Sequence, residues 1–278
     1  MTTAHSSADR IVGTLQRLLM QEDIRRAKET GSLPELPESF DFLTFALASS
    51  RSNYAQLAQD LWVLYELSRK QGGFFVEFGA GDGVLLSNTY LLETGYSWNG
   101  ILAEPCPAFH SSLSINRRAF ISTCCVTQET GSTVTFNHAE DPHYSTIDAY
   151  TTADEHAKLR QSGRRIEIET ISLRDLLQKG NAPRNIDYLS LDTEGSELEI
   201  LLTFDFAEYQ ITLITVEHNH TPREQKIDRL LARNGFERKF AGLSDFDGWY
   251  VNRAVLQTKS RSPFDNPRLN ALDDRSAI

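Results

Sequence analysis

Apolar positions follow two different spacings along the chain. From residue 74 onward, short and nearly continuous apolar runs alternate with stretches in which apolar positions recur every three or four residues. The runs predict strands at 74–78, 100–104, 119–126, 186–192 and 211–217. Helices are expected near 85–94, 107–117, 172–179, 195–203 and 222–234. Apolar strands that alternate with helices predict a mostly parallel sheet covered on both faces, which is a doubly wound α/β fold.

The regions around this alternation differ from it in pattern. Helical spacing predicts N-terminal helices at 11–29 and 54–70, joined by a proline-bearing link. Polar, hairpin-like stretches with a helix near 152–161 interrupt the alternation, and FERKFAGLSDFDGWYVNR predicts a final antiparallel pair. We therefore expect an N-terminal helical region (1–70), an α/β domain (71–256) with an insertion (131–171), and a polar C-terminal tail (257–278).

Composition narrows the classes of partner. The chain has 278 residues and a formal net charge of −10, which disfavours nucleic acid because phosphate binding needs a basic surface. Its three cysteines, Cys106, Cys124 and Cys125, have no metal-binding spacing and indicate a reducing compartment. The N-terminus has no signal-peptide pattern, and no apolar run approaches about 18 residues. We expect a cytoplasmic protein without a membrane span, and the sequence does not indicate its oligomeric state.

A glycine-rich turn follows the first predicted strand, in FFVEFGAGDG at residues 74–83. Its glycines, Gly79, Gly81 and Gly83, have the spacing G-x-G-x-G. A dinucleotide fingerprint, G-x-G-x-x-G, would have its third glycine at position 84, where this chain has Val84. A strand that ends in such a turn is typical of a site where a ligand approaches the backbone closely.

Acidic residues around the turn indicate which ligand it receives. Glu77 and Asp82 flank it and would repel a diphosphate, whereas they suit a ligand that carries positive charge. Glu104 ends the second strand 21 residues after Gly83, near the offset at which an acid binds ribose hydroxyls. S-adenosylmethionine has a sulfonium, an amino group and a ribose, and it fits all three acids. Because NAD would also use Glu104, the choice rests on the glycine spacing and on Glu77.

Three stretches, VEFGAGDGVLLSNTYLLE, NGILAEP and DYLSLDTEGSELEIL, resemble the FkbM-type family of S-adenosylmethionine-dependent methyltransferases. The similarity extends back to QLAQDLWVL at residues 56–64 and covers roughly residues 52–252. It implies a class I, Rossmann-like fold with a seven-stranded sheet whose last strand is antiparallel. It also implies methyl transfer, commonly to a hydroxyl of a sugar, a glycan or a glycosylated or polyketide-type metabolite.

Matching the motifs residue by residue implies that Glu77, Gly79, Gly81 and Glu104 contact the cofactor. Asn88 and the Gln59–Asp60 pair are weaker matches. The full set expected at the cofactor also includes Ala80, Asp82, Gly83, Pro105, Cys125 and Asp192.

Two predicted strand ends carry residues that could activate an alcohol, which is a poor nucleophile at neutral pH. Asp192 and Glu194 lie in LDTEGSE, and Glu217 and His218 lie in VEHNH. In one mechanism, Glu194 or His218 acts as a general base. In the other, Asp192 and Glu217, with His218 or Asn219, bind a divalent cation such as Mg²⁺, and Glu194 removes the proton.

The acceptor side and the rival functions are less clearly encoded. His143 and Tyr144, in DPHYST of the insertion, are expected to line the pocket of a small-molecule or glycan acceptor. Asp192 could instead only cap the next helix. A nicotinamide-dependent oxidoreductase and a non-catalytic nucleoside-binding module on the same fold are the alternatives to a methyltransferase.

Overall fold

The computed structural model describes residues 38–152, 155–252 and 254. The chain divides into two units, Met1–Ser50 and Arg51–Ile278, and each is described by itself. The helix expected at 11–29 and the tail expected at 257–278 lie outside the described residues.

The described part of the first unit is the helix α2 (Glu38–Ser49). The sequence analysis assigned no helix here. Glu38 and Asp41 lie in the first turn, where negative charge complements the helix dipole. The short 3₁₀ helix η1 (Ser50–Ser52) follows and leads into the second unit.

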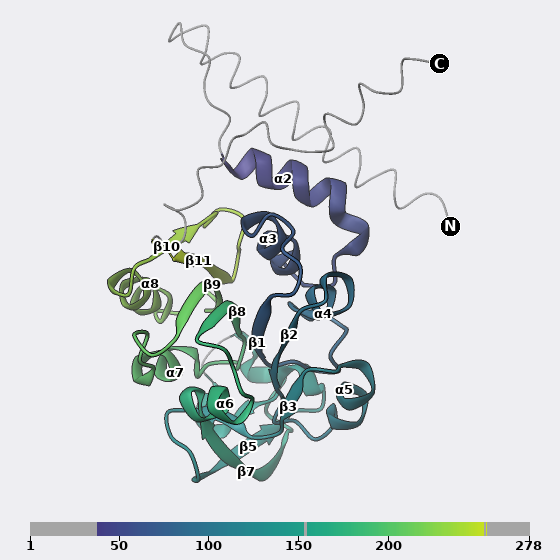
Figure 1. The fold of residues 1–278 in the computed structure, drawn as a ribbon. Helices are drawn as coiled ribbons and strands as arrows, with labels where there is room; N and C mark the ends of the chain where they lie inside the picture. The colour runs from purple at the N-terminus through teal and green to yellow at the C-terminus, as the bar shows by residue number, and fades with distance from the viewer. Residues whose placement is uncertain (1–37, 153–154, 253, 255–278) are drawn as a thin grey trace, which may run out of the picture. The chain divides into compact units, whose positions relative to one another are not determined.

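A seven-stranded sheet forms the centre of the second unit (Figure 1). Its order is β10-β11-β9-β8-β1-β2-β3, and β11 runs antiparallel to both of its neighbours. The strands are β1 (Phe74–Phe78), β2 (Asn99–Ala103), β3 (Phe120–Ser122), β8 (Asn185–Leu191), β9 (Gln210–Glu217), β10 (Phe236–Lys239) and β11 (Asp247–Asn252). This confirms the doubly wound sheet and its antiparallel last strand.

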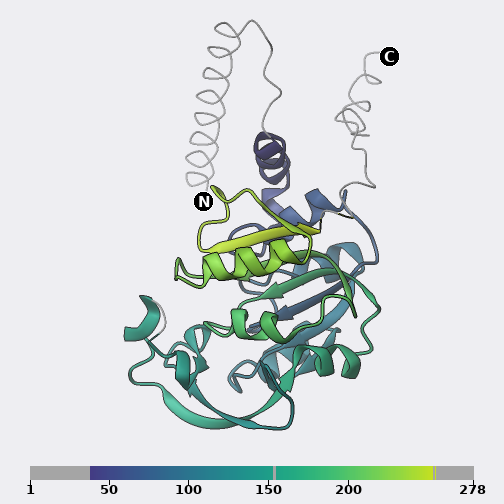
Figure 2. The same cartoon turned by 90° about the vertical axis from the view of Figure 1, so that its left-hand side faces the viewer.

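Helices cover both faces of this sheet (Figures 1 and 2). One face carries α3 (Gln59–Glu66), α4 (Tyr90–Tyr96) and α5 (His110–Asn116). The other carries α6 (Leu173–Lys179), α7 (Glu197–Thr203) and α8 (Glu224–Arg233), whose buried leucines and isoleucines form one apolar core with the strands. No helix in the described ranges is long and apolar enough to cross a membrane.

Two of the helices are shorter than the sequence predicts, for local reasons. Ala58, just before α3, has a left-handed backbone with φ of 63°, and the Asp60 carboxylate accepts hydrogen bonds from the amides of Tyr54 and Ala55. These contacts hold residues 54–58 outside the helix that was expected to begin at 54. The expected helix at 85–94 begins only at Tyr90 because the preceding residues wrap around the side chain of Glu77.

Strand alternation decides which face each β1 side chain reaches. Val76 and Phe78 belong to the core under α6, α7 and α8. Phe75 and Glu77 therefore point to the opposite face, where the Arg117 guanidinium lies 5.3 Å from the centre of the Phe75 ring.

The insertion forms a second, four-stranded sheet in the order β4-β7-β5-β6. Its strands are β4 (Cys125–Thr127), β5 (Thr133–His138), β6 (Thr146–Ile147) and β7 (Arg164–Ser172). The strand expected at 119–126 is thus two strands, because β3 pairs with β2 and β4 pairs with β7. Short 3₁₀ helices η2 (Pro142–Tyr144), η3 (Asp148–Tyr150) and η4 (Glu155–Lys158) complete it, and η4 replaces the longer helix expected near 152–161.

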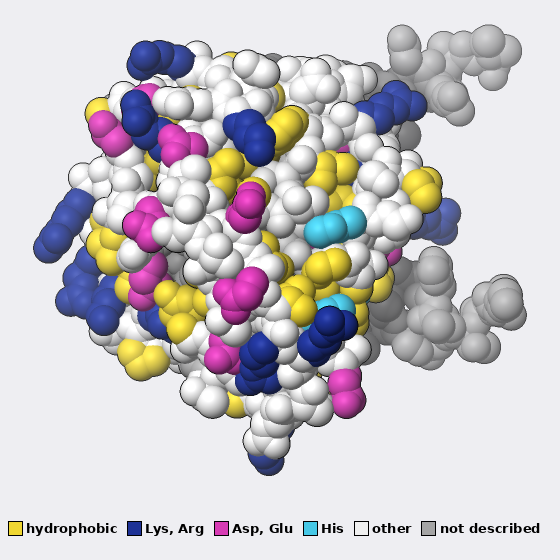
Figure 3. All heavy atoms as spheres, turned by 90° about the horizontal axis from the view of Figure 1, so that it is seen from below, with side chains coloured by type: hydrophobic (Ala, Val, Ile, Leu, Met, Phe, Trp, Pro, Cys, Tyr) yellow, Lys and Arg dark blue, Asp and Glu magenta, His cyan; other side chains and the backbone are white. Residues whose placement is uncertain are grey.

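The insertion leads into α6 and lies near the lower end of the view in Figure 1. The Ser172 hydroxyl caps α6 by accepting a hydrogen bond from the backbone amide of Asp175. On the face seen from below in Figure 3, acidic and basic side chains are interspersed, and histidines lie among hydrophobic side chains. The surface charge is therefore mixed on this face.

Candidate active site

A pocket of about 310 Å³ lies where the carboxyl ends of β1, β2, β8 and β9 meet the insertion. In parallel sheets, ligands bind at this edge. The residues of the predicted site that line it are Gln59, Gly79, Gly81, Asn88, Glu104, Pro105, Cys125, His143, Tyr144, Asp192, Glu194 and Glu217. Further lining residues, which the sequence analysis did not assign, include Leu85, Leu86, Phe109, Phe136, Ile147, His156, Phe246 and Asp247.

The glycine turn is fixed by close packing on all sides. A Cβ at Gly79, whose φ is +71°, would lie 2.1 Å from the carbonyl oxygen of Asp192. At Gly83, a Cβ would meet side-chain atoms of Arg117 and Leu113 at 2.6 and 2.8 Å. Gly81 has φ of +54° and faces the pocket beside His143. The three glycines therefore serve different purposes, and two of them allow close packing of the protein against itself.

Glu77 is placed differently from the prediction. Its buried carboxylate accepts hydrogen bonds from the Ser87 hydroxyl, the backbone N–H of Asn88 (2.7 Å) and the Thr89 hydroxyl. Arg117 Nη1 lies 3.5 Å from the same carboxylate. Glu77 is not among the residues that line the pocket in the described part of the chain. Strand alternation turns the Glu77 side chain under the 87–89 segment, where protein groups supply its donors, and its expected direct contact with the cofactor stays a prediction.

Two more acids of the predicted set hold backbone amides. Asp82 Oδ1 accepts from the amides of Val84 and Leu85, both at 2.8 Å. Asp60 accepts from three amides near the start of α3, and burial raises its pKa to about 6. Neither Asp60 nor Asp82 lines the pocket among the described residues, and the same holds for Ala80 and Gly83. Asp82 supports the turn and Asp60 supports the start of α3, while the expected contact of these four residues with the cofactor stays a prediction.

Glu104 and Asn88 do reach the pocket. The Glu104 carboxylate accepts from the amides of Gly81 (2.8 Å) and Cys106 (2.7 Å), and burial raises its pKa to about 7. Asn88 Nδ2 donates to the hydroxyl of Ser190, whereas its buried Oδ1 has no hydrogen-bond partner. A buried acceptor without a partner is costly, so this oxygen suits a donor supplied by a ligand.

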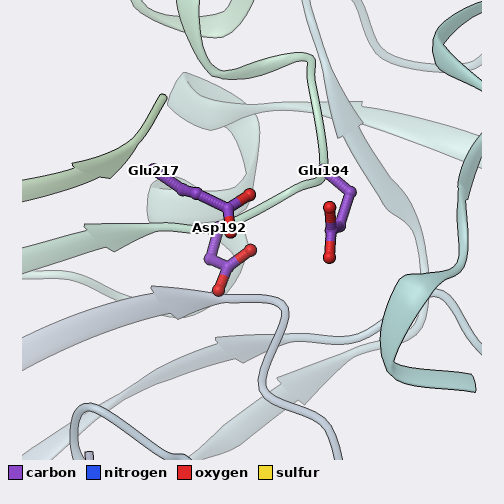
Figure 4. Close-up of side chains that lie close together, drawn as sticks. All are labelled: Asp192, Glu194 and Glu217. Carbon is purple, nitrogen blue, oxygen red and sulfur yellow. The ribbon is translucent and has the colours of Figure 1, made fainter. Parts of the chain in front are cut away.

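Three acids, Asp192, Glu194 and Glu217, lie at the other end of the pocket, and we call them the carboxylate cluster. One oxygen from each lies within 4.8 Å of the others. Figure 4 shows the side chains of Asp192 and Glu217 extending toward each other, with Glu194 across a gap on the following loop. Asp192 follows β8, Glu217 ends β9, and Glu194 has a left-handed backbone with φ of 60°.

Burial and mutual repulsion raise the pKa values of two members of this cluster, Asp192 and Glu217. Burial, with added repulsion from Asp247 and Glu197, raises the pKa of Asp192 to about 8. Burial and the nearby charge of Asp192 raise the pKa of Glu217 well above its usual range. Asp247 faces Glu217 across the β9–β11 pair, accepts from Gln59 Nε2 at 2.7 Å, and has a pKa raised by burial to about 7. Such carboxylates exchange protons near neutral pH.

His218 does not join this cluster. Its Nδ1 accepts from the His220 amide (3.1 Å), and its Nε2 lies 3.2 Å from Arg238 Nη2 and 3.6 Å from Glu224 Oε1. Burial lowers its pKa. The prediction of His218 as a base or metal ligand is thus corrected, because it follows Glu217 in the alternation and faces the other way.

The insertion brings His143 and Tyr144 to the pocket through η2. The Asp141 carboxylate caps this turn by accepting from the His143 amide at 3.1 Å. His143 packs against Phe109, with ring centres 4.8 Å apart, and Tyr144 packs against His156 at 4.7 Å. The two residues expected at the acceptor side therefore lie on an aromatic wall of the same pocket.

Comparison with known proteins gives distant structural similarity. A precorrin-6y C5,15-methyltransferase from Geobacter metallireducens GS-15 has 10% identity and a TM-score of 0.38, covering 69% of this chain and 85% of its own. A TehB-like SAM-dependent methyltransferase from Corynebacterium glutamicum ATCC 13032 has 8% identity and a TM-score of 0.35, covering 77% and 97%. No curated protein matches.

A family model gives the assignment. The model described as the methyltransferase FkbM domain matches residues 77–238, which is more than half of the chain and runs from Glu77 to Arg238. The match includes the glycine turn, Glu104, the insertion and the carboxylate cluster. The chain therefore belongs to the FkbM methyltransferase family, whose members use S-adenosylmethionine.

Proposed function

We propose that this enzyme transfers the methyl group of S-adenosylmethionine to a hydroxyl of a sugar, a glycan or a glycosylated or polyketide-type metabolite. The observation that supports the choice of a hydroxyl is the carboxylate cluster. An alcohol must lose its proton as it attacks, and an acid such as Asp192, whose pKa is raised to about 8, is suited to take it once a nearby positive charge favours its ionised form.

The cofactor would occupy the end of the pocket near the glycine turn. Glu104 is suited to accept hydrogen bonds from the ribose hydroxyls, and Asn88 Oδ1 is a free acceptor for the amino group. Gly81, Gln59, Pro105 and Cys125 line the same region. The sulfonium charge would lie between these residues and the cluster, and positive charge nearby favours the ionised form of Asp192 and Glu217. Binding of the donor would thereby prepare the proton acceptor.

The cluster also fits a divalent cation. Three carboxylates offer the hard oxygen ligands that Mg²⁺ and Ca²⁺ take in proteins, and their oxygens lie close enough to share one ion. Glu194 takes the place that the sequence analysis gave to His218. A bound cation would lower the pKa of the acceptor hydroxyl. The chain's own part is to hold these oxygens together and to move the proton.

The proposal is tested by incubating the enzyme and S-adenosylmethionine with a panel of neutral methyl glycosides and measuring S-adenosylhomocysteine. NMR of the product then locates the new methyl group. We expect an O-methyl ether, and loss of the product signal with Asp192→Asn but not with Asp205→Asn, an exposed acid beyond α7. Methylation at nitrogen or carbon would contradict the proposal. Activity that survives exhaustive chelation would exclude the cation and leave the carboxylates as the base.

The two alternatives are tested by the same preparation. An oxidoreductase would bind NAD rather than S-adenosylmethionine, and a non-catalytic module would bind the methyl donor without transferring its methyl group. Membership in a methyltransferase family favours neither. The cytoplasmic location and the domain limits at 70/71 and 256/257 remain predictions.

A further inference from the structure

Arg160 is a buried cation that the proposed chemistry does not use. Its side chain is 0% exposed, and it lies in the insertion between η4 and β7. A charge in such a place is tolerated only when it is paired and hydrogen-bonded. The partners of Arg160 therefore indicate why an arginine is there.

The Arg160 guanidinium connects the carboxylate cluster to the aromatic wall that carries His143 and Tyr144. Arg160 Nη2 donates to Glu194 Oε2 at 2.6 Å, and Arg160 Nε donates to the backbone carbonyl of Tyr144 at 2.8 Å. The planar fork of arginine holds two acceptors in fixed directions, which a lysine ammonium does not do. One side chain thus fixes Glu194 on the loop after β8 and the end of η2 together.

A second contact from the insertion reaches the same residue. The Thr146 hydroxyl donates to the backbone carbonyl of Glu194 at 2.9 Å. Glu194 is a non-glycine residue with φ of 60°, a conformation that costs free energy and persists only when its surroundings hold it. The insertion therefore holds both the side chain and the backbone of Glu194.

We propose that Arg160 is a positioning residue for methyl transfer: it sets the orientation of Glu194 relative to the aromatic wall. It acts through the Glu194 carboxylate and the Tyr144 carbonyl, to which it donates. This inference rests on the proposed function for the place of Glu194 in the chemistry. Its consequence is that acceptor binding and catalysis depend on Arg160, whereas cofactor binding does not.

The test measures three variants: Arg160→Lys, Glu194→Gln and the double variant that combines these two changes. Arg165→Met is the matched control, since Arg165 lies in the same insertion and pairs with Asp148 on the surface at 2.8 Å. The substrate is the methyl glycoside that the wild-type enzyme methylates in the panel. With it, Arg160→Lys is expected to lower kcat at least tenfold and to raise the KM of the acceptor. Its Kd for S-adenosylmethionine should stay within about twofold of the wild type. The double variant should be little worse than Glu194→Gln alone.

Hydrogen exchange of the folded enzyme gives a readout that needs no acceptor. In Arg160→Lys, the amides of residues 192–196 and 142–147 should exchange faster, and those of 79–88 should not change. An unchanged kcat, unchanged exchange at 192–196, or additive losses in the double variant would overturn the proposal. Methylation at nitrogen would refute the proposed hydroxyl acceptor while leaving the role of Arg160 to be judged by the same kinetic comparison.

Discussion

Two groups of buried acids lie at the carboxyl edge of one sheet, and they have opposite surroundings. Glu77 has hydroxyl and amide donors around its carboxylate and the Arg117 guanidinium beside it. Asp192 and Glu217 instead face each other and Asp247, and their pKa values are raised by burial and by like charge. The same kind of side chain is a structural anchor in one place and, under the proposed function, a proton acceptor in the other.

The difference shows that a buried acid is defined by what surrounds it. A carboxylate that is satisfied by donors stabilises its neighbours, and Glu77 binds the hydroxyls and the backbone amide of residues 87–89 in this way. A buried carboxylate without enough donors is destabilised in its ionised form by burial and by like charge nearby. A positively charged ligand reduces this destabilisation. The two groups should therefore respond in opposite ways when the charge is removed from each.

The largest effect is expected for Asp192→Asn. Loss of the proton acceptor should lower kcat about 10²- to 10⁴-fold, as for removal of a general base. Because the change also removes a repelling charge, the free energy of unfolding at pH 8 should equal or exceed that of the wild type. Steady-state kinetics and denaturant unfolding measure the two quantities. A variant with full activity would remove Asp192 from the mechanism.

Glu77→Gln should have the opposite result. It places an amide group among donors that need an acceptor, so we expect the free energy of unfolding to fall by about 2–4 kcal/mol. Denaturant unfolding measures this loss, and Asp192→Asn serves as the matched isosteric change. If Glu77→Gln left the stability unchanged and Asp192→Asn lowered it, the contrast between the two groups would be wrong.

The pH dependence of stability follows from the same contrast. The folded pKa values of Glu104 and Asp247 are about 7, above those of the unfolded chain, so the folded state binds more protons between about pH 4 and 7. Stability is then greatest at low pH within this range and is lost as the pH rises through 7. We expect each of the two groups to contribute a fall on the order of 2 kcal/mol from pH 5.5 to pH 8.

Saturating S-adenosylmethionine should reduce this fall, because a cationic ligand favours ionised carboxylates. Its Kd should correspondingly decrease as the pH rises through 7. Urea titrations with and without the cofactor, at matched ionic strength, measure the effect. Stability that rises over this range in the absence of cofactor would contradict the assignment.

The smallest effect is expected at Asn88. Asn88→Ala removes the free acceptor Oδ1 and should weaken S-adenosylmethionine binding about tenfold. Asn88→Asp retains an acceptor oxygen at that position and should bind more tightly than Asn88→Ala. Calorimetric titration of the two variants measures the difference, and equal affinities would mean that this oxygen does not meet the cofactor.

Much of the fold could be predicted from the sequence, because apolar periodicity reports burial directly. The strand at 74–78 has the predicted bounds, and the final antiparallel pair expected in FERKFAGLSDFDGWYVNR is present. Helix starts were predicted less well. They depend on single contacts, such as those of Asp60 with the amides before α3, that periodicity does not record.

Within the site, the sequence placed strand-end acids better than it assigned their neighbours. Glu104, Asp192 and Glu217 were expected at the pocket and lie there. Glu77 and His218 were expected there as well, but they do not line this pocket, because one step of strand alternation turns each side chain away from it. A signal for Asp247 was present, since it begins the final antiparallel strand beside the strand that ends at Glu217.

The close contact between Gly79 and the carbonyl of Asp192 has a consequence for how the enzyme can change. With no room for even a methyl group between them, the glycine turn and the backbone at Asp192 form one tightly packed block. The aromatic wall belongs to a separate sheet that reaches this block through β4 and a few side chains. New acceptors are therefore best sought by exchanging residues of the insertion while leaving the central sheet untouched.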